Sequence, residues 1–254
     1  MQKISTVCST FKSDKKINTL INSFTSQNYP SKELILVDGS EKKKDYDLIL
    51  KIVKKFKNVK IFYLPRSSIY ECLNFGIIKS SGTIINIMGD DDKYYNKEIF
   101  RNISKTISSN IDYIYGDTIY EKNGKKIRYY KSFDMKKNLM SLAYMPSHTS
   151  LFVKKNVYTV LGNYNINYKI ASDLEFFFRL YKNRKYKYKY IKKVITIMSD
   201  GGTSNKSVKN IFKSNLEAYK ILNKNKYSFT LIRIIIKLAL KYLMLLKFST
   251  KKYE

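Results

Sequence analysis

The sequence predicts an α/β fold in which helices flank a mostly parallel sheet and a helical extension follows at the C-terminus. In the first hundred residues, four short apolar segments typical of strands alternate with segments of helical spacing, the pattern of parallel strands joined by crossover helices. The strand segments are continuously apolar, as in sheets covered on both faces. Only helical patterns remain beyond Asn205. We therefore expect one domain over residues 1–204 and a basic, amphipathic helical extension over residues 205–254.

The individual elements follow in order along the chain. The predicted strands cover residues 4–8, 33–37, 60–64 and 83–88. Helices are expected between them, where apolar residues recur at helical spacing, at 17–24, 49–56 and 69–78. Asp14 is positioned to cap the first of these helices. The later elements are a helix near 99–107, a strand at 113–120, a hairpin turn at Asn123-Gly124 and a helix at 171–182.

The charge of the chain is strongly positive, with 49 Lys and Arg residues against 20 Asp and Glu and a formal net charge of +29. Such a balance favours an anionic partner, which can be nucleic acid, a membrane surface or a phosphorylated substrate. A bias toward Lys, Ile, Asn and Tyr, as from A+T-rich coding, accounts for part of the excess. Cys8 and Cys72 have neither metal-ligand nor disulfide-framework spacing, which fits a reducing cytoplasm. Residues 1–10 lack the apolar core of a signal peptide, and no uncharged run is long enough to span a membrane.

Three acidic residues stand directly after the fourth predicted strand. Asp90, Asp91 and Asp92 follow the apolar run TIINIM and one glycine. Ligands of open α/β sheets bind beyond the carboxyl ends of the strands, and adjacent carboxylates there repel each other unless a cation neutralises them. Oxygen ligands of this kind suit Mg²⁺ or Mn²⁺ shared with substrate phosphates. The alternative is a solvated acidic turn or a helix cap.

Three further residues are candidates for the same site. Asp38 ends the second predicted strand, where it can bind a base or ribose or can simply form a turn before glycine. Asp173 precedes an apolar helix, so it is either a helix cap or a general base, with Glu175 as the second candidate for the base. His148 is the single histidine, and such a residue serves more often in a structural hydrogen bond than in catalysis.

Several enzyme classes lack their signatures in this sequence. No G-x-G-x-x-G follows a strand, which argues against a dinucleotide oxidoreductase. A phosphate-binding G-x-x-x-x-G-K-[ST] loop and the G-x-S-x-G elbow of serine hydrolases are absent as well.

Taken together, these segments resemble the bacterial family 2 glycosyltransferases of the GT-A fold, especially the branch that builds capsule, exopolysaccharide and lipopolysaccharide sugars. The similarity runs from about Ile4 to Ser204. Its landmarks, in family order, are ISTVCSTFKSDKKI, LINSFTSQNYPSKELILVDGS, SIYECLNFGIIKSSGTIINIMGDDD, YIYGD, PSHTSLFVKK, LGNYNINYKIASDLEFFFRL and DGGTS. The resemblance implies a Rossmann-like GT-A catalytic domain over residues 1–204.

The resemblance also implies roles for single residues in binding the donor. Thr10 and Phe11, with Asp14 nearby, are implied to form the first loop against the nucleotide, and Asp38 to contact its uracil or ribose. Asp91 is implied to lie with them at the nucleotide sugar.

The remaining implied roles concern the metal, the base and the cleft. Asp90 and Asp92 match the ends of the family's D-x-D signature and are implied to hold Mn²⁺ or Mg²⁺. Asp173 matches the aspartate that is the base in inverting members. His148 and Asp117 occupy positions near the substrate cleft in this branch.

The sequence departs from the family pattern at several of these landmarks. Phe11-Lys12 replaces an aromatic-Asn pair, and Arg66 replaces a common Asp. Ser68 and Glu71 stand where the family has Gly and Asp, and Gly89 precedes the acidic cluster in place of Asn-x. These changes bear on donor binding, and Arg66 is a candidate to pair with the donor diphosphate.

The implied activity is an inverting, metal-dependent transfer of a hexosyl-type sugar from a nucleotide donor, most simply a UDP-sugar, to an acceptor hydroxyl on a glycan or a lipid-linked acceptor. Surface polysaccharide or lipopolysaccharide synthesis is the implied setting. Two alternatives come from other classes. A nucleic-acid-binding protein would use the basic and aromatic stretch at 184–193, which is equally well an exposed strand of a basic protein. A nucleotidyltransferase would need a phosphate loop that CSTFKSDKK matches poorly.

The C-terminal segment FTLIRIIIKLALKYLMLLKF predicts a helix at a membrane surface. Arg233, Lys237 and Lys241 recur every fourth residue and therefore share one helical face, while apolar residues cover most of the remaining circumference. We expect the basic face to meet anionic headgroups and the apolar arc to meet acyl chains. The enzyme would then be cytoplasmic and peripheral on the inner face of the bacterial cytoplasmic membrane, with no nucleic-acid partner. The alternative is a helix that packs on the domain or in a dimer contact.

Overall fold

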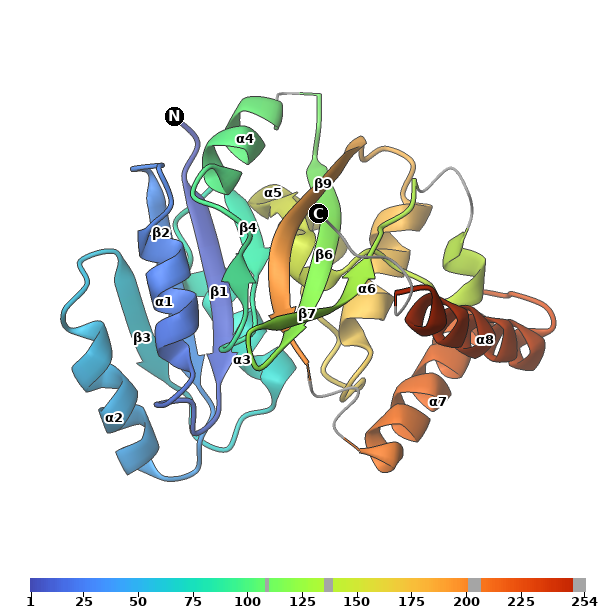
Figure 1. Ribbon diagram of the computed structural model, residues 1–254, viewed down its shortest axis with the longest axis horizontal. Helices are drawn as coiled ribbons and strands as arrows, with labels where there is room; N and C mark the ends of the chain where they lie inside the picture. Colours follow the sequence, from blue (N-terminus) through green and yellow to red (C-terminus); the bar gives the residue numbers. More distant parts are fainter. Residues whose placement is uncertain (108–109, 135–138, 201–206, 249–254) are drawn as a thin grey trace.

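A computed structural model describes residues 1–107, 110–134, 139–200 and 207–248, and within them one mixed sheet of nine strands runs through the molecule (Figure 1). The strand order is β3-β2-β1-β4-β8-β6-β9-β5, and β7 pairs with β6 off this path. The first four strands of the chain occupy one end of this strand order, and the later strands occupy the other.

The order of strands and helices in the first half is as predicted, although the second helix begins earlier than expected, at Lys43, and ends before Phe56. The strands β1 (Ile4–Thr10), β2 (Lys32–Asp38), β3 (Val59–Tyr63) and β4 (Ile84–Ile87) are all parallel to one another. They are connected by α1 (Ile17–Thr25), α2 (Lys43–Val53) and α3 (Ile69–Lys79). The apolar face read from the sequence of α1 is the buried one, with Ile17, Leu20, Ile21 and Phe24 all fully buried.

Local sequence also explains how α3 begins. The Ser68 side chain accepts a hydrogen bond from the backbone N–H of Glu71, and the Glu71 carboxylate accepts one from the backbone N–H of Ser68 (2.7 Å). This reciprocal capping satisfies two backbone donors at the start of the helix. The two departures from the family pattern at these positions therefore form a helix cap. Arg66, by contrast, pairs with the exposed Glu41 (2.8 Å) and does not line the cavity described below.

The second half is mixed in strand direction. It comprises β5 (Lys93–Tyr94), α4 (Ile99–Thr106), β6 (Tyr113–Lys122), β7 (Lys125–Tyr130), β8 (Phe152–Lys154), α5 (Lys155–Leu161), α6 (Ser172–Lys182) and β9 (Tyr188–Ser199), with short 3-10 turns at Leu139–Leu142 and His148–Ser150. The strand β8 is antiparallel to both β4 and β6, whereas β6 and β9 are parallel. Asn123 and Gly124 both have positive φ (49° and 76°), which confirms the predicted hairpin turn between β6 and β7.

Of the alternating Lys and Tyr residues at 184–193, those from Tyr188 onward form the first part of β9, which pairs with β6 in the sheet. Tyr188 and Tyr190 stack on Tyr115 at centroid distances of 5.9 and 5.3 Å, while Lys187 and Lys189 are exposed. The interleaving is thus the period of a strand with one packed and one solvated face. These two tyrosines are partly buried against the core and do not form the open stacking platform that a nucleic-acid-binding groove requires.

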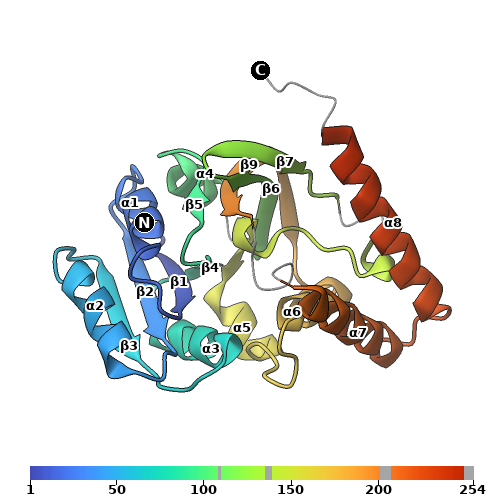
Figure 2. The same cartoon turned by 60° about the horizontal axis from the view of Figure 1, so that its bottom comes forward.

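Two apolar cores cover the faces of the sheet. One lies under α1, α2 and α4, and the other under α3, α5 and α6 (Figure 2). The second core continues into α7 (Val208–Lys224), where Ala218, Ile221 and Leu222 are fully buried, and reaches Ile234 of α8 (Thr230–Phe248). The predicted C-terminal helices are therefore present, and α7 packs against the same core as α6. No described helix is long and apolar enough to cross a membrane.

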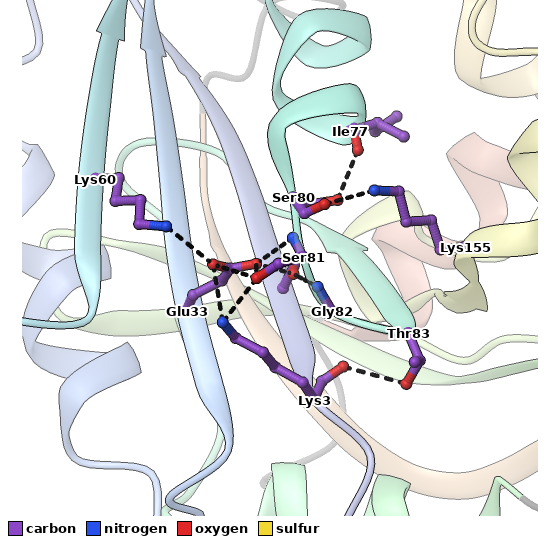
Figure 3. A network of polar contacts seen from close by, with 10 residues as sticks. Lys3, Glu33, Lys60, Ile77, Ser80, Ser81, Gly82, Thr83 and Lys155 are labelled. Atoms are coloured by element: carbon purple, nitrogen blue, oxygen red, sulfur yellow. Dashed lines mark hydrogen bonds and ion pairs between the residues drawn. The ribbon is translucent and has the colours of Figure 1, made fainter.

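The opposite end of the sheet from the site described below is fixed by a polar network (Figure 3). Glu33, at the start of β2, is buried and accepts hydrogen bonds from Ser5 Oγ (2.6 Å) and from the backbone N–H of Ser81 (2.6 Å). Lys3 Nζ lies 3.1 Å from the same carboxylate and Lys60 Nζ 3.7 Å. Burial by itself would raise the pKa of Glu33, but these hydrogen bonds outweigh it and lower the pKa to about 2.

Candidate active site

A cavity of about 350 Å³ opens beyond the carboxyl ends of β1 and β4, where the fold class leads one to expect a ligand. Its lining includes six of the predicted site residues, which come from widely separated segments, namely Phe11, Asp90, Asp91, Asp92, His148 and Asp173. Four other predicted residues lie outside this lining, namely Thr10, Asp14, Asp38 and Asp117.

Asp92 is the most deeply buried of the three clustered acids, with 3% of its surface exposed. Its carboxylate accepts hydrogen bonds from the backbone N–H groups of Gly89 (3.1 Å) and Ser199 (3.0 Å). Burial, with the charges of Asp91 and Asp90, raises its pKa to about 7 despite these bonds. A buried carboxylate of this kind is stabilised when a cation binds to it.

Gly89 is required by the position of that carboxylate. A Cβ atom at residue 89 would lie 2.6 Å from Asp92 Oδ2, which is closer than non-bonded atoms approach. The loop can therefore fold the Asp92 side chain back against its own backbone only because residue 89 has no side chain. This explains the departure from the family pattern directly before the acidic residues.

The other two acids differ in their surroundings. Asp90 accepts a hydrogen bond from Ser13 Oγ, and burial raises its pKa. Asp91 pairs with Lys16 Nζ at 3.3 Å, and its charge raises the pKa of Lys16. Asp91 thus has a cationic partner in the protein, whereas neither Asp90 nor Asp92 forms an ion pair with a described residue.

The acidic cluster fits a cation that is shared with a substrate. Among the described residues, no group of three or more His, Cys, Asp or Glu side chains is arranged to hold a metal ion. The cluster is therefore no all-protein cage of the kind used for structural metals. Mg²⁺-type sites in phosphate chemistry need only one or two carboxylates, because water and substrate phosphates complete the coordination shell. The buried Asp92 and the partly buried Asp90 meet that smaller requirement.

Thr10 and Asp38 do not line the cavity but lie next to residues that do. They are direct partners in the register of β1 and β2, and Thr10 Oγ1 donates to Asp38 Oδ2 (2.8 Å). Asp38 is fully buried, burial raises its pKa, and it also accepts from the backbone N–H of Ser40 (3.1 Å). Phe11, which is 40% exposed, lies over Gly39 and lines the cavity. Asp38 thus holds the two loops that support Phe11.

The prediction that Asp14 caps the first helix is wrong. The helix α1 begins at Ile17, its N-cap position is Lys16, and no side chain caps it. Instead, the backbone carbonyl of Ser13 accepts hydrogen bonds from the N–H groups of Lys16 and Ile17, both at 2.9 Å. Asp14 lies in the turn between Phe11 and the helix.

Asp173, which belongs to α6, lines the same cavity as the acidic cluster. It is the second residue of α6, whose N-cap position is Ala171, so Asp173 is not the N-cap residue. Its Oδ1 accepts from the backbone N–H of Leu174 (2.8 Å), and Tyr70 Oη lies 3.4 Å from the same oxygen. Its Oδ2 lies 3.7 Å from His148 Nδ1. Burial lowers the pKa of His148, and the charge of Asp173 opposes that shift.

Glu175 and Asp117 are engaged elsewhere. The Glu175 carboxylate accepts from Arg179 Nε (3.0 and 3.1 Å) and lies outside the cavity lining. Asp117 is 1% exposed and accepts from Tyr190 Oη (2.7 Å), from the backbone N–H of Ser132 (2.8 Å) and from Tyr129 Oη. The structure does not bring Asp117 to the cleft but places it in the hydrogen-bonding core of the second half of the sheet.

Several residues of the site were missed by sequence reasoning. Lys16, Tyr70, Lys169 and Ser199 line the cavity. Glu217 of α7 accepts hydrogen bonds from three successive backbone N–H groups directly before α6, those of Lys169 (2.9 Å), Ile170 (2.9 Å) and Ala171 (2.8 Å). Nothing in the local sequence distinguishes Lys16 among so many lysines. The DGGTS landmark lies outside the described residues beyond Asp200.

Comparison with curated proteins identifies two groups of relatives. A PGL/p-HBAD biosynthesis glycosyltransferase of Mycobacterium tuberculosis is 24% identical over 200 residues, which cover 77% of each chain. An uncharacterized glycosyltransferase of Haemophilus influenzae is 25% identical over 130 residues, which cover 50% of this chain and 52% of the other.

Solved structures have the same fold. S. aureus TarS 1-349 in complex with UDP superposes with a TM-score of 0.64 at 19% identity, and the match covers 87% of this chain and 64% of that chain. The mannosyltransferase PcManGT from Pyrobaculum calidifontis, solved with GDP-Man and Mn²⁺, superposes with a TM-score of 0.65 at 12% identity and covers 94% and 73%. These neighbours are glycosyltransferases of the GT-A type, and the chain has the GT-A fold.

The family comparison covers most of the residues that line the cavity. The model of the family described as Glycosyl transferase family 2 matches residues 5–187, a range that contains the acidic cluster, His148 and Asp173. The chain belongs to glycosyl transferase family 2, and it is a glycosyltransferase.

Proposed function

We propose that this glycosyltransferase is an inverting, metal-dependent enzyme that moves a hexosyl-type sugar from a UDP-sugar to an acceptor hydroxyl. The observation that carries the proposal is that one cavity is lined by Asp90 and Asp92, which follow β4, and by Asp173, which belongs to α6. An acidic cluster is suited to the diphosphate end of a donor, and a separate single carboxylate is suited to an attacking hydroxyl.

Asp90 and Asp92 would hold Mn²⁺ or Mg²⁺, which would offset the negative charge that grows on the leaving diphosphate. Lys16 keeps Asp91 compensated, so the loop does not repel the donor as strongly as three bare carboxylates would. Phe11, half-exposed in the first loop, offers an aromatic face to the nucleotide base. Asp38 supports that loop from behind and would act on the nucleotide through it.

Asp173 would take the proton of the acceptor hydroxyl as that oxygen attacks the anomeric carbon. Its Oδ1 accepts a hydrogen bond from the backbone N–H of Leu174, so the carboxylate is already oriented before an acceptor binds. One displacement from the face opposite the diphosphate inverts the anomeric configuration. His148, beside Oδ2, would contact the same acceptor, and a neutral imidazole there fits the lowered pKa.

The choice of UDP is supported by the TarS structures solved with UDP and UDP-GlcNAc. The alternative nucleotide is GDP, because PcManGT was solved with GDP-Man. A panel of UDP- and GDP-sugars tests both choices through slow donor hydrolysis with and without Mn²⁺. We expect metal-dependent hydrolysis of a UDP-sugar and a product sugar of inverted configuration by ¹H NMR. Hydrolysis of GDP-sugars alone would reassign the donor, and a retained configuration would exclude the displacement by a single step.

The acceptor is proposed to be a glycan or lipid-linked molecule, and the enzyme to work at the inner face of the cytoplasmic membrane. Support comes from relatives that are named for PGL/p-HBAD biosynthesis and from the exposed apolar side of α8. In Figures 1 and 2 this helix lies at the edge of the molecule opposite α2. Its exposed side includes Phe229, just before the helix, with Leu231, Ile232, Ile235 and Ile236.

The expected orientation of that helix requires a correction. Arg233 donates from Nε to the Ser228 carbonyl (2.7 Å) and from Nη1 to the Ser141 carbonyl (3.4 Å), and Lys237 Nζ lies 3.4 Å from Asn215 Oδ1. Arg233 and Lys237 therefore face the body of the enzyme and not anionic headgroups. The side chain of Lys241 lies outside the described part of the structure. The apolar side remains available for insertion among acyl chains.

Liposome flotation tests the membrane proposal on the full chain. A double substitution Leu231→Gln/Ile235→Gln should release the protein from anionic vesicles. A matched control with Ile78→Gln/Val160→Gln removes equally exposed apolar side chains from α3 and α5 and should float like the wild type. Wild-type protein that stays at the bottom would contradict the proposal.

A further inference from the structure

A second cavity, of about 230 Å³, adjoins the first at the candidate base. The two share His148, Ile170, Asp173 and Met198, so the second lies beyond Asp173 as seen from the acidic cluster. Its walls come from the β6–β7 hairpin, from the segment after the 3-10 turn at Leu139–Leu142 and from both C-terminal helices, through Tyr120, Arg128, Tyr130, Tyr144, Asn215 and Lys237. This is the space in which the part of an acceptor next to its attacking hydroxyl would lie.

Arg128 has an unusual environment in this cavity. It is the partner of Tyr120 in the β6–β7 register, and its guanidinium carbon lies 3.6 Å from the centroid of the Tyr120 ring. Its Nε atom is buried and has no hydrogen-bond partner among the described residues. No carboxylate of the described chain forms an ion pair with it, in contrast to Arg66, Arg101 and Arg179.

The charged residues that line this cavity also favour an anionic ligand. Its lining contains the cations Arg128 and Lys237, and Asp173 is the one acidic residue in it. Arg128 forms no ion pair with a carboxylate of the described residues, and a partly buried cation of this kind is stabilised when an anion binds beside it. The planar guanidinium also presents donors in a fork that matches the oxygens of a carboxylate or a phosphate. Tyr130 and Tyr144, which stack on each other at 5.4 Å, add aromatic surface for the body of a ligand.

We propose that this cavity is an anion-binding acceptor subsite, in which Arg128, assisted by Lys237, binds a phosphate or carboxylate group carried by the acceptor close to its attacking hydroxyl. The inference rests on the proposed function, because it assigns the acceptor side of the cavity to the space beyond Asp173. Its consequence is specificity, since a neutral acceptor would leave the positive charge of Arg128 without a counter-ion in the cavity.

Matched small probes test the subsite in the presence of UDP and Mn²⁺. The probes are 4-nitrophenyl glucuronide, 4-nitrophenyl phosphate and the neutral 4-nitrophenyl glucoside, with dissociation constants measured by ligand-observed NMR. We expect at least one anionic probe to bind about ten- to a hundredfold more tightly than the glucoside, as for one charge-assisted hydrogen-bonded pair. The better of the two anionic probes distinguishes a carboxylate from a phosphate.

Variants assign the preference to the cavity. Arg128→Gln should abolish the difference between anionic and neutral probes, and Lys237→Gln, from another element, should reduce it. Arg101→Gln removes one exposed cation outside the cavity and should leave the preference intact, which controls for attraction by the net charge. Equal binding of all three probes by the wild type, or a preference that survives in both cavity variants, would overturn the proposal.

UDP titration with Mn²⁺ on the same samples separates the two claims. An intact anion preference without metal-dependent UDP binding would refute the donor assignment and leave the subsite standing. Normal UDP binding without an anion preference would refute the subsite alone.

Discussion

The carboxylate of Glu217 accepts a hydrogen bond from the backbone N–H of Ala171 (2.8 Å), two residues before Asp173. The same carboxylate binds the N–H groups of Lys169 and Ile170, and only 7% of Glu217 is exposed. A helix of the C-terminal extension thus holds the segment that leads into α6, in which the candidate base is the second residue. The extension therefore helps to position Asp173 as well as forming part of the surface.

Substitution Glu217→Ala should lower kcat for transfer by about tenfold or more while leaving UDP affinity unchanged, because residues 169–171, which lead into α6 and Asp173, lose their anchor and the acidic cluster does not. The stability should fall by about 2–4 kcal/mol, as expected for a buried set of charge-assisted hydrogen bonds. Steady-state kinetics, UDP calorimetry and urea unfolding measure the three effects. The exposed Glu98→Ala is the matched control. A parallel loss of UDP affinity in Glu217→Ala would indicate general damage to the fold.

Asp92→Asn should abolish metal-dependent UDP binding while the melting temperature without metal stays within about 3 °C, equal to roughly 1 kcal/mol for a chain of this size. The side chain keeps its size, and the cost of burying a charge disappears. Calorimetric UDP titration with and without Mn²⁺ measures the binding. A variant that binds UDP as the wild type does, with the same response to Mn²⁺, would remove Asp92 from the metal site.

Gly89→Ala tests the geometry of the acidic loop without changing any charge. The new methyl group would contact Asp92 Oδ2 and must displace that carboxylate. We expect metal-dependent UDP binding to weaken by about tenfold or more, although all three aspartates are retained. Unchanged UDP affinity in Gly89→Ala would mean that the folded-back position of Asp92 is irrelevant to donor binding.

Glu33→Gln should destabilise the fold without touching the site. Because hydrogen bonds lower the folded-state pKa of Glu33 from 4.5 to about 2, this group stabilises the fold fully above pH 4.5, and its contribution is lost as the pH falls toward 2. The difference from wild type should be about 3 kcal/mol at pH 7 and should shrink between pH 6 and pH 3. Urea unfolding across that range measures it. The exposed Glu41→Gln should show little difference at any pH.

The sequence predicted those parts of the fold that depend on local pattern. The apolar strands of the first half and the acids that end β4 lie within short windows, so their positions could be read directly. Strand order in the second half depends on pairs such as Asp117 with Val194, which are far apart in sequence. The spacing of apolar residues along the chain cannot reveal such partners. The hydrogen bond from the Ala171 N–H to Glu217 could not be predicted for the same reason.

One local signal was present and was interpreted only as a departure from the family. Ser68 and Glu71 have the spacing of a capping box, which predicts the start of α3 without any alignment. The basic stripe of α8 shows the opposite limit. Its spacing was read correctly, but spacing does not tell which face a helix turns toward the protein, and Arg233 and Lys237 face inward.

The most direct test of the central claim is single-turnover transfer by Asp173→Asn at saturating UDP-sugar and Mn²⁺. If Asp173 is the base on the acceptor wall, the variant should bind UDP within a few-fold of wild type, while the transfer rate should fall by about two orders of magnitude or more. A rate near that of wild type, with UDP binding intact, would contradict the assignment of Asp173 and of the cavity wall it defines.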